Sequence, residues 1–275
     1  MTDRTSVLTP LTDWSAAVRA RARIGHTLEV HETIGSTNDR ARELLFEAGG
    51  DGGVVLAEVQ TAGRGRRGRT WISPAGVNLT LSVALRPALA AAEGWQLGLA
   101  TALATLDACR TATPTPTPAL GLKWPNDIVA GDERKVAGLL IETVMSGERL
   151  IGAVVGIGIN VNWRPSDMPA EIGRRAKSLS SLAGADVDRA ALLDRLLDAL
   201  DDELVAVEAG RSPLARYRAA CVTIGREVTV ESAAGTLEGT AIGLDAHGSL
   251  LLQTASGRVA LSTGEVETVR GGSPG

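Results

Sequence analysis

The chain has 275 residues, 44% of them hydrophobic, which is enough to bury a core and suggests about two domains. Its 28 basic and 32 acidic residues give a net charge of -4, which argues against general nucleic-acid binding. Only two cysteines occur, far apart, which excludes a disulfide scaffold. Because the sequence shows neither a secretory signal nor a membrane-spanning run, we expect a cytoplasmic location.

The first part of the chain alternates helical and strand patterns. We expect a short helix at 14–23, a strand at 28–31, a helix at 39–48 and a strand at 53–60. Ser36, Thr37 and Asn38 precede the second helix, where small polar side chains commonly cap the first turn. Ordinary capping is one interpretation of these residues, and recognition of a polar, neutral ligand is the other.

The stretch 63–71 holds four arginines and three glycines in nine residues and cannot form a core. Glycine lets the backbone approach a ligand, and arginine binds carboxylate or phosphate through paired hydrogen bonds. The glycine spacing fits the dinucleotide fingerprint and nearly fits a P-loop, but both motifs require a helix to follow. Pro74 and Gly76 are followed instead by period-two alternation, which predicts a strand at 77–86. We therefore expect an anion-binding loop, although the composition is also typical of a solvated surface loop.

The middle of the chain is predicted to contain one helix followed by several strands. The helix is expected at 95–110, and the Thr-Pro repeat at 113–118 predicts a stiff connector. Segments 120–124, 127–129 and 135–145 are expected to form a hairpin with a turn around Gly131 and Asp132. The run 151–161 combines glycine with β-branched residues, which is typical of a central strand approached by a ligand or of tight sheet packing.

The C-terminal part begins with helices and ends with strands. An amphipathic helix is predicted at 189–209, with its carboxylates on a solvated face, and a second helix at 214–221. Beyond residue 222 we expect five short strands, at 226–230, 236–244, 250–254, 258–262 and 265–269. Short strands at this spacing predict a small closed β-barrel appended to the main domain.

The side chains with evident chemistry are cations and amides. The three histidines lie too far apart in the sequence to suggest a metal site or a catalytic triad. The polar residues that stand out at strand ends and in loops are Gln60, Arg64, Arg66, Arg69, Lys123, Asn126, Lys135 and Asn160. Because such groups neutralise phosphates, a reaction driven by charge stabilisation is the favoured hypothesis.

Five runs of residues carry a resemblance to a known family. They are Ser36-Thr37-Asn38, Gln60 with 62–69, Lys123-Trp124-Pro125-Asn126-Asp127, 135–142 and 156–160. In this order they resemble the motifs of biotin protein ligases, and the terminal strands resemble the small C-terminal domain of that family. The resemblance implies a mixed β-sheet with flanking helices, of the α+β class and akin to class II aminoacyl-tRNA synthetases and lipoate ligases, plus an SH3-like barrel.

The resemblance also implies a division of the chain and a reaction. Residues 1–221 would form the catalytic domain that binds biotin and ATP, and 222–270 the C-terminal barrel. Biotin and ATP would form biotinyl-5′-AMP, and a lysine of a biotin carboxyl carrier protein domain of acyl-CoA carboxylases would then accept the biotinyl group. Magnesium is expected to arrive with ATP rather than in a protein cage. Some family members carry an N-terminal DNA-binding module, for which the stretch before Ser36 is too short, so we do not expect DNA as a partner. Because the apolar runs are too short or too polar to span a bilayer, we expect no membrane partner either.

Residue roles follow from the same resemblance. The expected catalytic cations are Lys135, Arg64 and Arg66. The expected biotin-binding residues are Ser36, Thr37, Asn38, Gln60, Gly63, Arg64, Gly65, Arg66, Lys135, Gly138 and Gly158. The expected ATP-binding residues are Arg66, Arg69, Trp71, Lys123, Asn126 and Asn160, with Trp71 stacking on the adenine side.

Two features of the sequence qualify these expectations, the turn before Lys135 and the arginine loop. Glu133 and Arg134 lengthen the turn before Lys135 relative to the family pattern, which puts the hairpin tip in doubt but not Lys135. The arginine loop is expected to be disordered without ligand and ordered by an adenylate.

Two alternative functions are weighed against this one. A lipoate-type ligase on the same fold would have a longer apolar tunnel and fewer polar groups around Ser36 and Gln60. A biotin-responsive DNA-binding regulator is disfavoured by the net negative charge.

Overall fold

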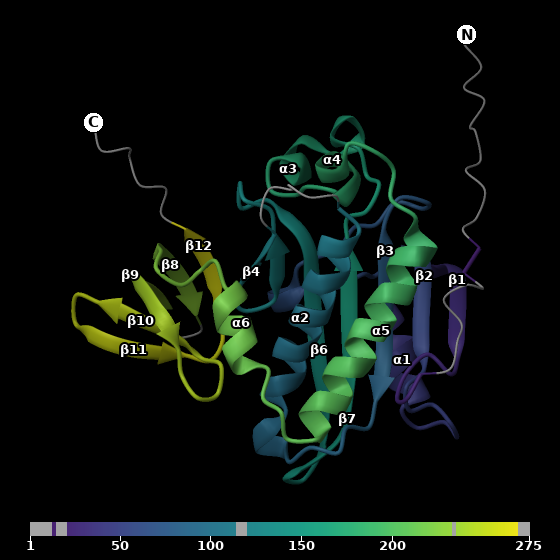
Figure 1. The fold of residues 1–275 in the computed structure, drawn as a ribbon, viewed down its shortest axis with the longest axis horizontal. Coiled ribbons are helices and arrows are strands. Elements are labelled where there is room, and N and C mark those ends of the chain that lie inside the picture. The colour runs from purple at the N-terminus through teal and green to yellow at the C-terminus, as the bar shows by residue number, and fades with distance from the viewer. Residues whose placement is uncertain (1–12, 15–20, 114–119, 233–234, 269–275) are drawn as a thin grey trace.

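The computed structural model describes residues 13–14, 21–113, 120–232 and 235–268, and it contains a seven-stranded mixed sheet in the order β1-β2-β3-β7-β6-β5-β4 (Figure 1). Strands β1 and β2 pair in parallel, and all other neighbours are antiparallel. The strands are β1 (Leu28–Ile34), β2 (Val54–Gln60), β3 (Leu79–Leu85), β4 (Gly121–Lys123), β5 (Asp127–Val129), β6 (Lys135–Ser146) and β7 (Arg149–Ile159). The expected mixed sheet and the central position of the glycine-rich strand are confirmed.

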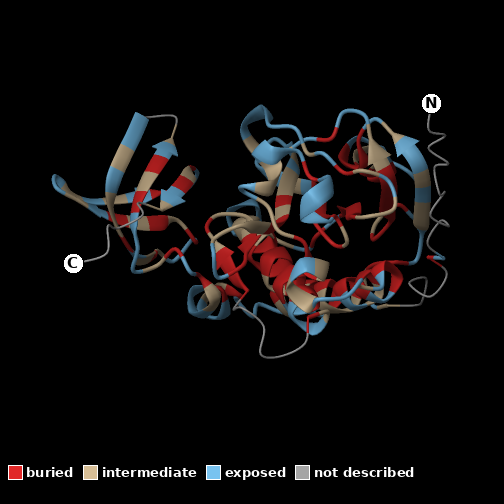
Figure 2. Ribbon diagram, turned by 90° about the horizontal axis from the view of Figure 1, so that it is seen from above, coloured by how far each residue is buried: buried red, intermediate tan, exposed pale blue. Residues whose placement is uncertain are grey.

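Helices cover both faces of this sheet. Alternation along the strands sends Val54 and Val155 into the main core with the long helices, whereas Val55 and Val154 pack with α1 on the other face. Figure 2 shows buried residues concentrated where α2 and α5 meet the sheet. The α-helices are α1 (Thr37–Leu44), α2 (Trp95–Thr111), α3 (Ala170–Gly173), α4 (Leu179–Ala183), α5 (Arg189–Glu208) and α6 (Leu214–Ala220). None of the helices in the described ranges is long and apolar enough to cross a bilayer.

The acidic residues of α5 do not form a uniformly solvated face, which corrects the expectation. Asp201 is buried, and its carboxylate accepts hydrogen bonds from the backbone N–H groups of Ala22, Arg23 and Ile24 at 2.7 to 3.0 Å. These bonds satisfy three backbone donors of the segment that precedes β1. Helical periodicity marked the apolar face of α5 but gave no sign of a chain segment lying along its polar side.

The C-terminal strands form a five-stranded antiparallel sheet in the order β11-β10-β9-β8-β12. They are β8 (Glu227–Ser232), β9 (Gly235–Leu244), β10 (Leu250–Thr254), β11 (Gly257–Leu261) and β12 (Glu265–Thr268). Among the described residues no pairing joins β11 to β12, so the expected closed barrel is wrong. The two edge strands have five and four residues, which leaves few backbone groups with which to close the sheet.

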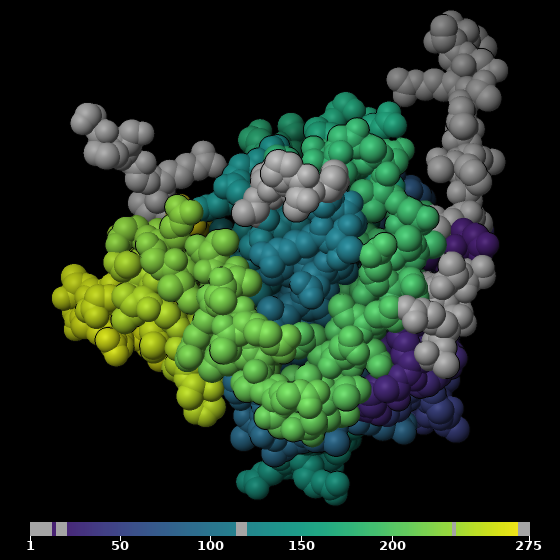
Figure 3. Space-filling model, in the orientation of Figure 1, coloured from purple at the N-terminus to yellow at the C-terminus, as the bar shows by residue number. Residues whose placement is uncertain are grey.

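The C-terminal sheet packs beside the helical layer. Figure 3 shows α2 between α5 and α6 on one face of the molecule, with the C-terminal strands adjoining at the left. The Nε1 of Trp124 donates to the Gly248 carbonyl at 3.0 Å, and Arg218 donates to the Leu244 carbonyl at 2.7 Å. Most of the helix expected at 14–23 and the repeat at 114–118 lie outside the described residues.

Candidate active site

Two adjoining cavities lie where the motif-bearing loops meet the sheet. The larger is a cleft of about 880 Å³ between the arginine loop, the 123–135 hairpin, the 171–176 segment and the C-terminal strand β12. The smaller, of about 50 Å³, lies against the N-terminal end of α1 and strands β6 and β7. Residues that line both cavities are Gly65, Arg66, Trp71, Asn126 and Lys135. A ligand spanning the two cavities would therefore contact these five residues.

The floor of the small cavity is a buried network of neutral polar groups. The Oγ of Ser82 lies 2.6 Å from Asn38 Oδ1 and 2.7 Å from Thr37 Oγ1. Because an amide oxygen can only accept, the Ser82 hydroxyl donates to Asn38. The backbone N–H of Thr37 donates to Gln60 Oε1 at 2.7 Å. This bond identifies the oxygen end of the amide, and the NH₂ group at the other end has no hydrogen-bond partner among the described residues. The cavity thus presents the Gln60 amide donor to a ligand.

Ser36 occupies the N-cap position of α1, as its place in the sequence predicted. Its side chain makes no capping hydrogen bond, although the residue is buried at 3% exposure. The residue lines the small cavity. Ordinary side-chain capping by Ser36 is therefore not observed, and its recognition of a polar ligand stays a prediction.

Three glycines on neighbouring strands form a side-chain-free wall of the small cavity. A Cβ on Gly156 would lie 2.3 Å from Asn38 Oδ1, and one on Gly158 would lie 2.4 Å from the indole of Trp71. A Cβ on Gly138 would lie 2.6 Å from Lys135 Nζ. The absence of side chains therefore lets Asn38, Trp71 and Lys135 approach the sheet backbone.

Trp71 lies at the junction of the cavities. Its indole covers Gly158, and Lys135 Nζ is 5.7 Å from the ring centroid. The indole Nε1 is buried without a hydrogen-bond partner. Because an orphaned buried donor is unfavourable, a ligand atom that accepted this bond would be stabilised.

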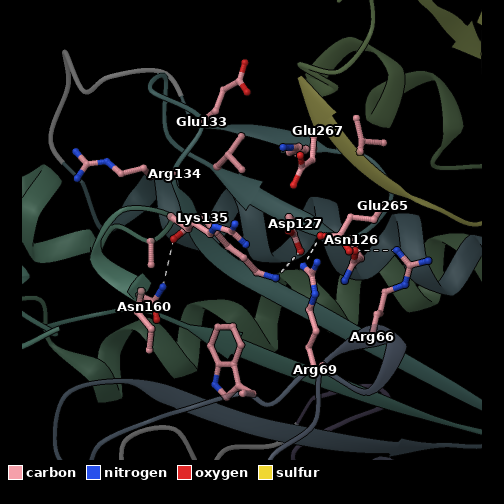
Figure 4. Close-up of a pocket in the computed structure, with 18 of the residues that line it drawn as sticks. Arg66, Arg69, Asn126, Asp127, Glu133, Arg134, Lys135, Asn160, Glu265 and Glu267 are labelled. Carbon is pink, nitrogen blue, oxygen red and sulfur yellow. Dashed lines mark hydrogen bonds and ion pairs between the residues drawn. The ribbon is translucent and has the colours of Figure 1, made fainter. Parts of the chain in front are cut away.

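Lys135 begins β6 and points into the cleft (Figure 4). Its Nζ is 2.7 Å from Asp127 Oδ1, and its backbone carbonyl accepts from Asn160 Nδ2 at 3.2 Å. Glu133 takes a positive φ of 63° at the hairpin tip, which absorbs the lengthened turn and leaves Lys135 at the start of the strand. The ammonium group is therefore held at the junction by a carboxylate that an anionic ligand could replace.

The four loop arginines contact α1, the 123–135 hairpin and the C-terminal sheet. Arg64 forms a two-bond pair with Asp39 at 2.7 and 2.8 Å, and Arg66 donates to Asn126 Oδ1 at 3.0 Å. The loop's other two arginines contact the C-terminal sheet, where Arg67 Nη1 lies 3.7 Å from a Glu231 carboxylate oxygen and Arg69 forms an ion pair with Glu265.

Burial and pairing change the pKa values of the loop arginines in opposite directions. Burial lowers the pKa of the half-buried Arg66 guanidinium, whereas the hydrogen bonds that Arg64 donates to Asp39 raise the pKa of Arg64. These shifts reflect the contacts that hold the loop to side chains distant in sequence.

The structure brings the expected site residues together with one exception. All of the expected biotin-binding residues except Gly63 line the small cavity, and all of the expected ATP-binding residues line the large cleft. Gly63 instead supports the loop, because a Cβ there would lie 2.5 Å from the Trp71 carbonyl. The roles of all these residues remain predictions.

Sequence reasoning missed several groups at the site. Gly156 lines the small cavity, and Ser82 is buried behind it, bonded to Asn38. A polar residue within the apolar alternation of β3 was the available signal for Ser82. Arg174 and Arg175 line the cleft and, like Lys123, form no hydrogen bond or ion pair through their side chains with another described residue. No pattern in the sequence around 171–176 indicated that this segment reaches the cleft.

The described residues contain no cluster of three or more His, Cys, Asp or Glu side chains that could hold a metal ion.

Comparisons with known proteins agree with this geometry. Residues 30–160 match the biotin/lipoate A/B protein ligase family, and residues 223–268 match the biotin protein ligase C-terminal domain. The biotin–acetyl-CoA-carboxylase ligase of Mycobacterium tuberculosis is 37% identical over 247 residues, covering 88% of this chain and 89% of that protein. The bifunctional ligase/repressor BirA of Bacillus subtilis is 33% identical over 246 residues, covering 89% of this chain and 74% of that protein.

Solved structures give the same result. The biotin protein ligase from Aquifex aeolicus in complex with biotin and ATP superimposes with a TM-score of 0.74 and 32% identity, covering 89% of this chain and 99% of that one. The chain belongs to the biotin protein ligase family.

Proposed function

We propose that this chain activates biotin with ATP as biotinyl-5′-AMP and transfers the biotinyl group to a lysine of a biotin carboxyl carrier protein domain. The observation that carries this proposal is the junction of the two cavities. A small cavity lined by neutral polar groups adjoins a larger cleft rich in arginine and lysine, and Lys135 lies where they meet. Family membership supports the same activity.

The small cavity suits the biotin bicycle. The ureido carbonyl requires N–H donors, and Gln60 presents an NH₂ group whose orientation is set by the bond from Thr37 to its oxygen. The side-chain-free wall at Gly158 and the indole of Trp71 supply apolar contact area for the remaining rings. The bicycle would then direct its carboxylate toward Lys135.

The first step brings two anions together. A carboxylate oxygen of biotin attacks the α-phosphorus of ATP, the bond from that phosphorus to the oxygen bridging to the β-phosphate breaks, and pyrophosphate leaves. Two unit charges about 4 Å apart repel by about 4 kcal/mol at an effective dielectric near 20, so the site needs cations. Lys135 would exchange Asp127 for the carboxylate and the phosphate, and Arg66 would approach them from the loop.

The nucleotide would occupy the large cleft. Lys123, Arg174 and Arg175 carry charges that no described carboxylate neutralises through an ion pair, so they are available to the polyphosphate. Asn126 and Asn160 supply amides at the same cleft, with Asn160 fixed through the Lys135 carbonyl. Magnesium bound to ATP would neutralise part of the remaining phosphate charge.

The second step needs access for a carrier domain. The amine of the carrier lysine attacks the carbonyl carbon of the adenylate, and AMP leaves. Beyond Leu139 the outer edge of β6 has no paired strand among the described residues, although β7 pairs with its inner edge as far as Ser146. An open strand edge beside the small cavity suits docking of a carrier domain by strand addition.

One experiment tests the function directly. The chain incubated with biotin, MgATP and a carrier domain should yield a carrier heavier by one biotinyl group in a mass spectrum. Lipoate in place of biotin should give little or no product, because its dithiolane ring has no ureido group to bond the Gln60 amide in the small cavity. An unmodified carrier under conditions that modify it with a known ligase would contradict the proposal.

Other expectations remain predictions. These are the two-domain division at 221 and 222, the absence of DNA binding and the cytoplasmic location. A gel-shift assay with the purified chain and biotin checks the second of them, and shifted DNA would contradict it.

A further inference from the structure

Glu142 lies beside the small cavity and has no assigned role. It stands on β6 two residues beyond Leu140, on the sheet face that also carries Gly138. Its side chain is 26% exposed, and it pairs across the sheet with Val154. A partly buried carboxylate at this position needs partners, and it has them in two different parts of the site.

The first partner is the amide of Asn38. Glu142 Oε2 accepts a hydrogen bond from Asn38 Nδ2 at 2.8 Å, while Ser82 donates to Asn38 Oδ1 at 2.6 Å. Because a carboxylate only accepts, the two bonds fix which end of the amide is oxygen and which is nitrogen. Asn38 is 5% exposed, and a charge-assisted bond to so buried a group strongly favours one orientation.

The second partner is the arginine loop. The same Oε2 lies 3.6 Å from Arg64 Nη2 and 3.9 Å from Arg42 Nη2. Arg64 is also bonded to Asp39, the residue that follows Asn38 in α1. One carboxylate oxygen is therefore shared between the floor of the cavity and the side chain that approaches the cavity from the loop.

We propose that Glu142 is a positioning residue of the biotin site, which couples the orientation of the Asn38 amide to the position of Arg64 at the small cavity. The inference rests on the proposed function, because it takes the small cavity to be the biotin site. With the carboxylate in place, the Asn38 amide presents a fixed edge to the ligand and Arg64 is drawn over the cavity. Without the Glu142 carboxylate, the Asn38 amide can rotate, and Arg64 retains only its ion pair with Asp39.

Two substitutions separate the two actions. E142A removes both the acceptor and the charge, so the Kd for biotin should rise about tenfold or more. E142Q retains an oxygen that can accept from Asn38 Nδ2, so the Kd for biotin should stay within about threefold of the wild type. Its neutral amide attracts Arg64 less, so bound biotinyl-5′-AMP should dissociate about three to five times faster.

The readouts exclude a merely structural role. Glu142 does not line the nucleotide cleft, so the KM for ATP should stay within about twofold in both variants. The matched control is E43A, which removes an exposed carboxylate of α1 that pairs with Arg40 and should leave biotin binding unchanged. Adding E142A to N38A should cost little more than N38A alone, because the group being positioned is already gone.

The outcomes are decisive. Unchanged biotin binding by E142A would overturn the inference, as would equal rises in the KM for biotin and for ATP together with a lowered melting temperature. Should E142A fail to fold, E142Q still decides, since unchanged adenylate release by that variant would contradict the coupling to Arg64. A wild-type chain that binds no biotin would overturn the proposed function as well, whereas wild-type binding with an unaffected E142A would overturn this inference alone.

Discussion

The floor of the small cavity and the arginine loop are neighbours built on opposite principles. The floor consists of buried hydroxyls and amides, such as Ser82 at 0% exposure, that are bonded to one another. The loop carries exposed cations such as Arg64, bonded to carboxylates distant in sequence. The neutral groups of the floor are thus fixed in the core before a ligand binds. The charged groups of the loop are held at the surface by ion pairs that are individually weak and easily exchanged.

The largest effect is expected where the two regions meet. Lys135→Ala removes the cation at the junction of the cavities, and biotin-dependent exchange of pyrophosphate into ATP should fall by about 10³-fold. The control is Lys177→Ala, whose ammonium pairs with Asp132 at 3.1 Å, and exchange there should remain within about threefold of the wild type. Near-normal exchange by Lys135→Ala would assign the charge stabilisation to other residues.

The floor should be sensitive in stability as well as in binding. Ser82→Ala leaves Asn38 Oδ1 without its donor in a buried site, so the free energy of unfolding should fall by about 1–3 kcal/mol in a urea titration. Thr80→Val on the same strand is the matched control. The Thr80 hydroxyl is buried without a partner, so its removal should be neutral or stabilising. A larger loss for Thr80→Val than for Ser82→Ala would contradict the network described.

The loop should respond to salt and ligand, unlike the floor. Raising the salt to about 0.5 M should increase proteolytic cleavage within 63–71 about two- to threefold, because exposed ion pairs such as Arg67 with Glu231 are screened. Biotin with MgATP should then make the loop resistant. Cleavage is measured by gel electrophoresis. Equal cleavage with and without the ligands would show that the loop does not close on an adenylate.

The smallest effect concerns Asp132 at the hairpin tip. Partial burial acts to raise its pKa, but hydrogen bonds from Arg134 and Lys177 outweigh it and lower the pKa to about 2. Because the folded pKa lies below the unfolded one, this stabilisation is present above about pH 4 and is lost as the pH falls toward 2. The side chain is 40% exposed, so Asp132→Asn should lower the free energy of unfolding at pH 7 by less than about 1 kcal/mol. No dependence of that difference on pH between about 2 and 5 would contradict the assignment.

Local patterns in the sequence predicted which segments carry the site. The polar residues before α1, the loop at 63–71 and the strand start at Lys135 all lie at the cavities, because each is marked by an unusual residue type at the end of an apolar run. Alternation and turn signals also predicted the hairpin in which β5 and β6 pair.

Contacts between distant segments were not predictable in this way. Nothing local to Glu265 indicates that it pairs with Arg69, and nothing local to Asp201 indicates that it binds the backbone near Arg23. The open edge of the C-terminal sheet has the same origin. Strand spacing predicts how many strands form, but closure depends on how far the edges curl in three dimensions.

The glycine wall has a consequence for altering the substrate range of this chain. At Gly138, Gly156 and Gly158 the pocket is bounded by main chain, which no substitution can trim further. Mutations at these positions can only narrow the space, so a bulkier vitamin analogue would have to be accommodated by shortening Leu140 or by displacing Trp71. A screen for enzymes that use enlarged analogues is therefore best directed at those two positions.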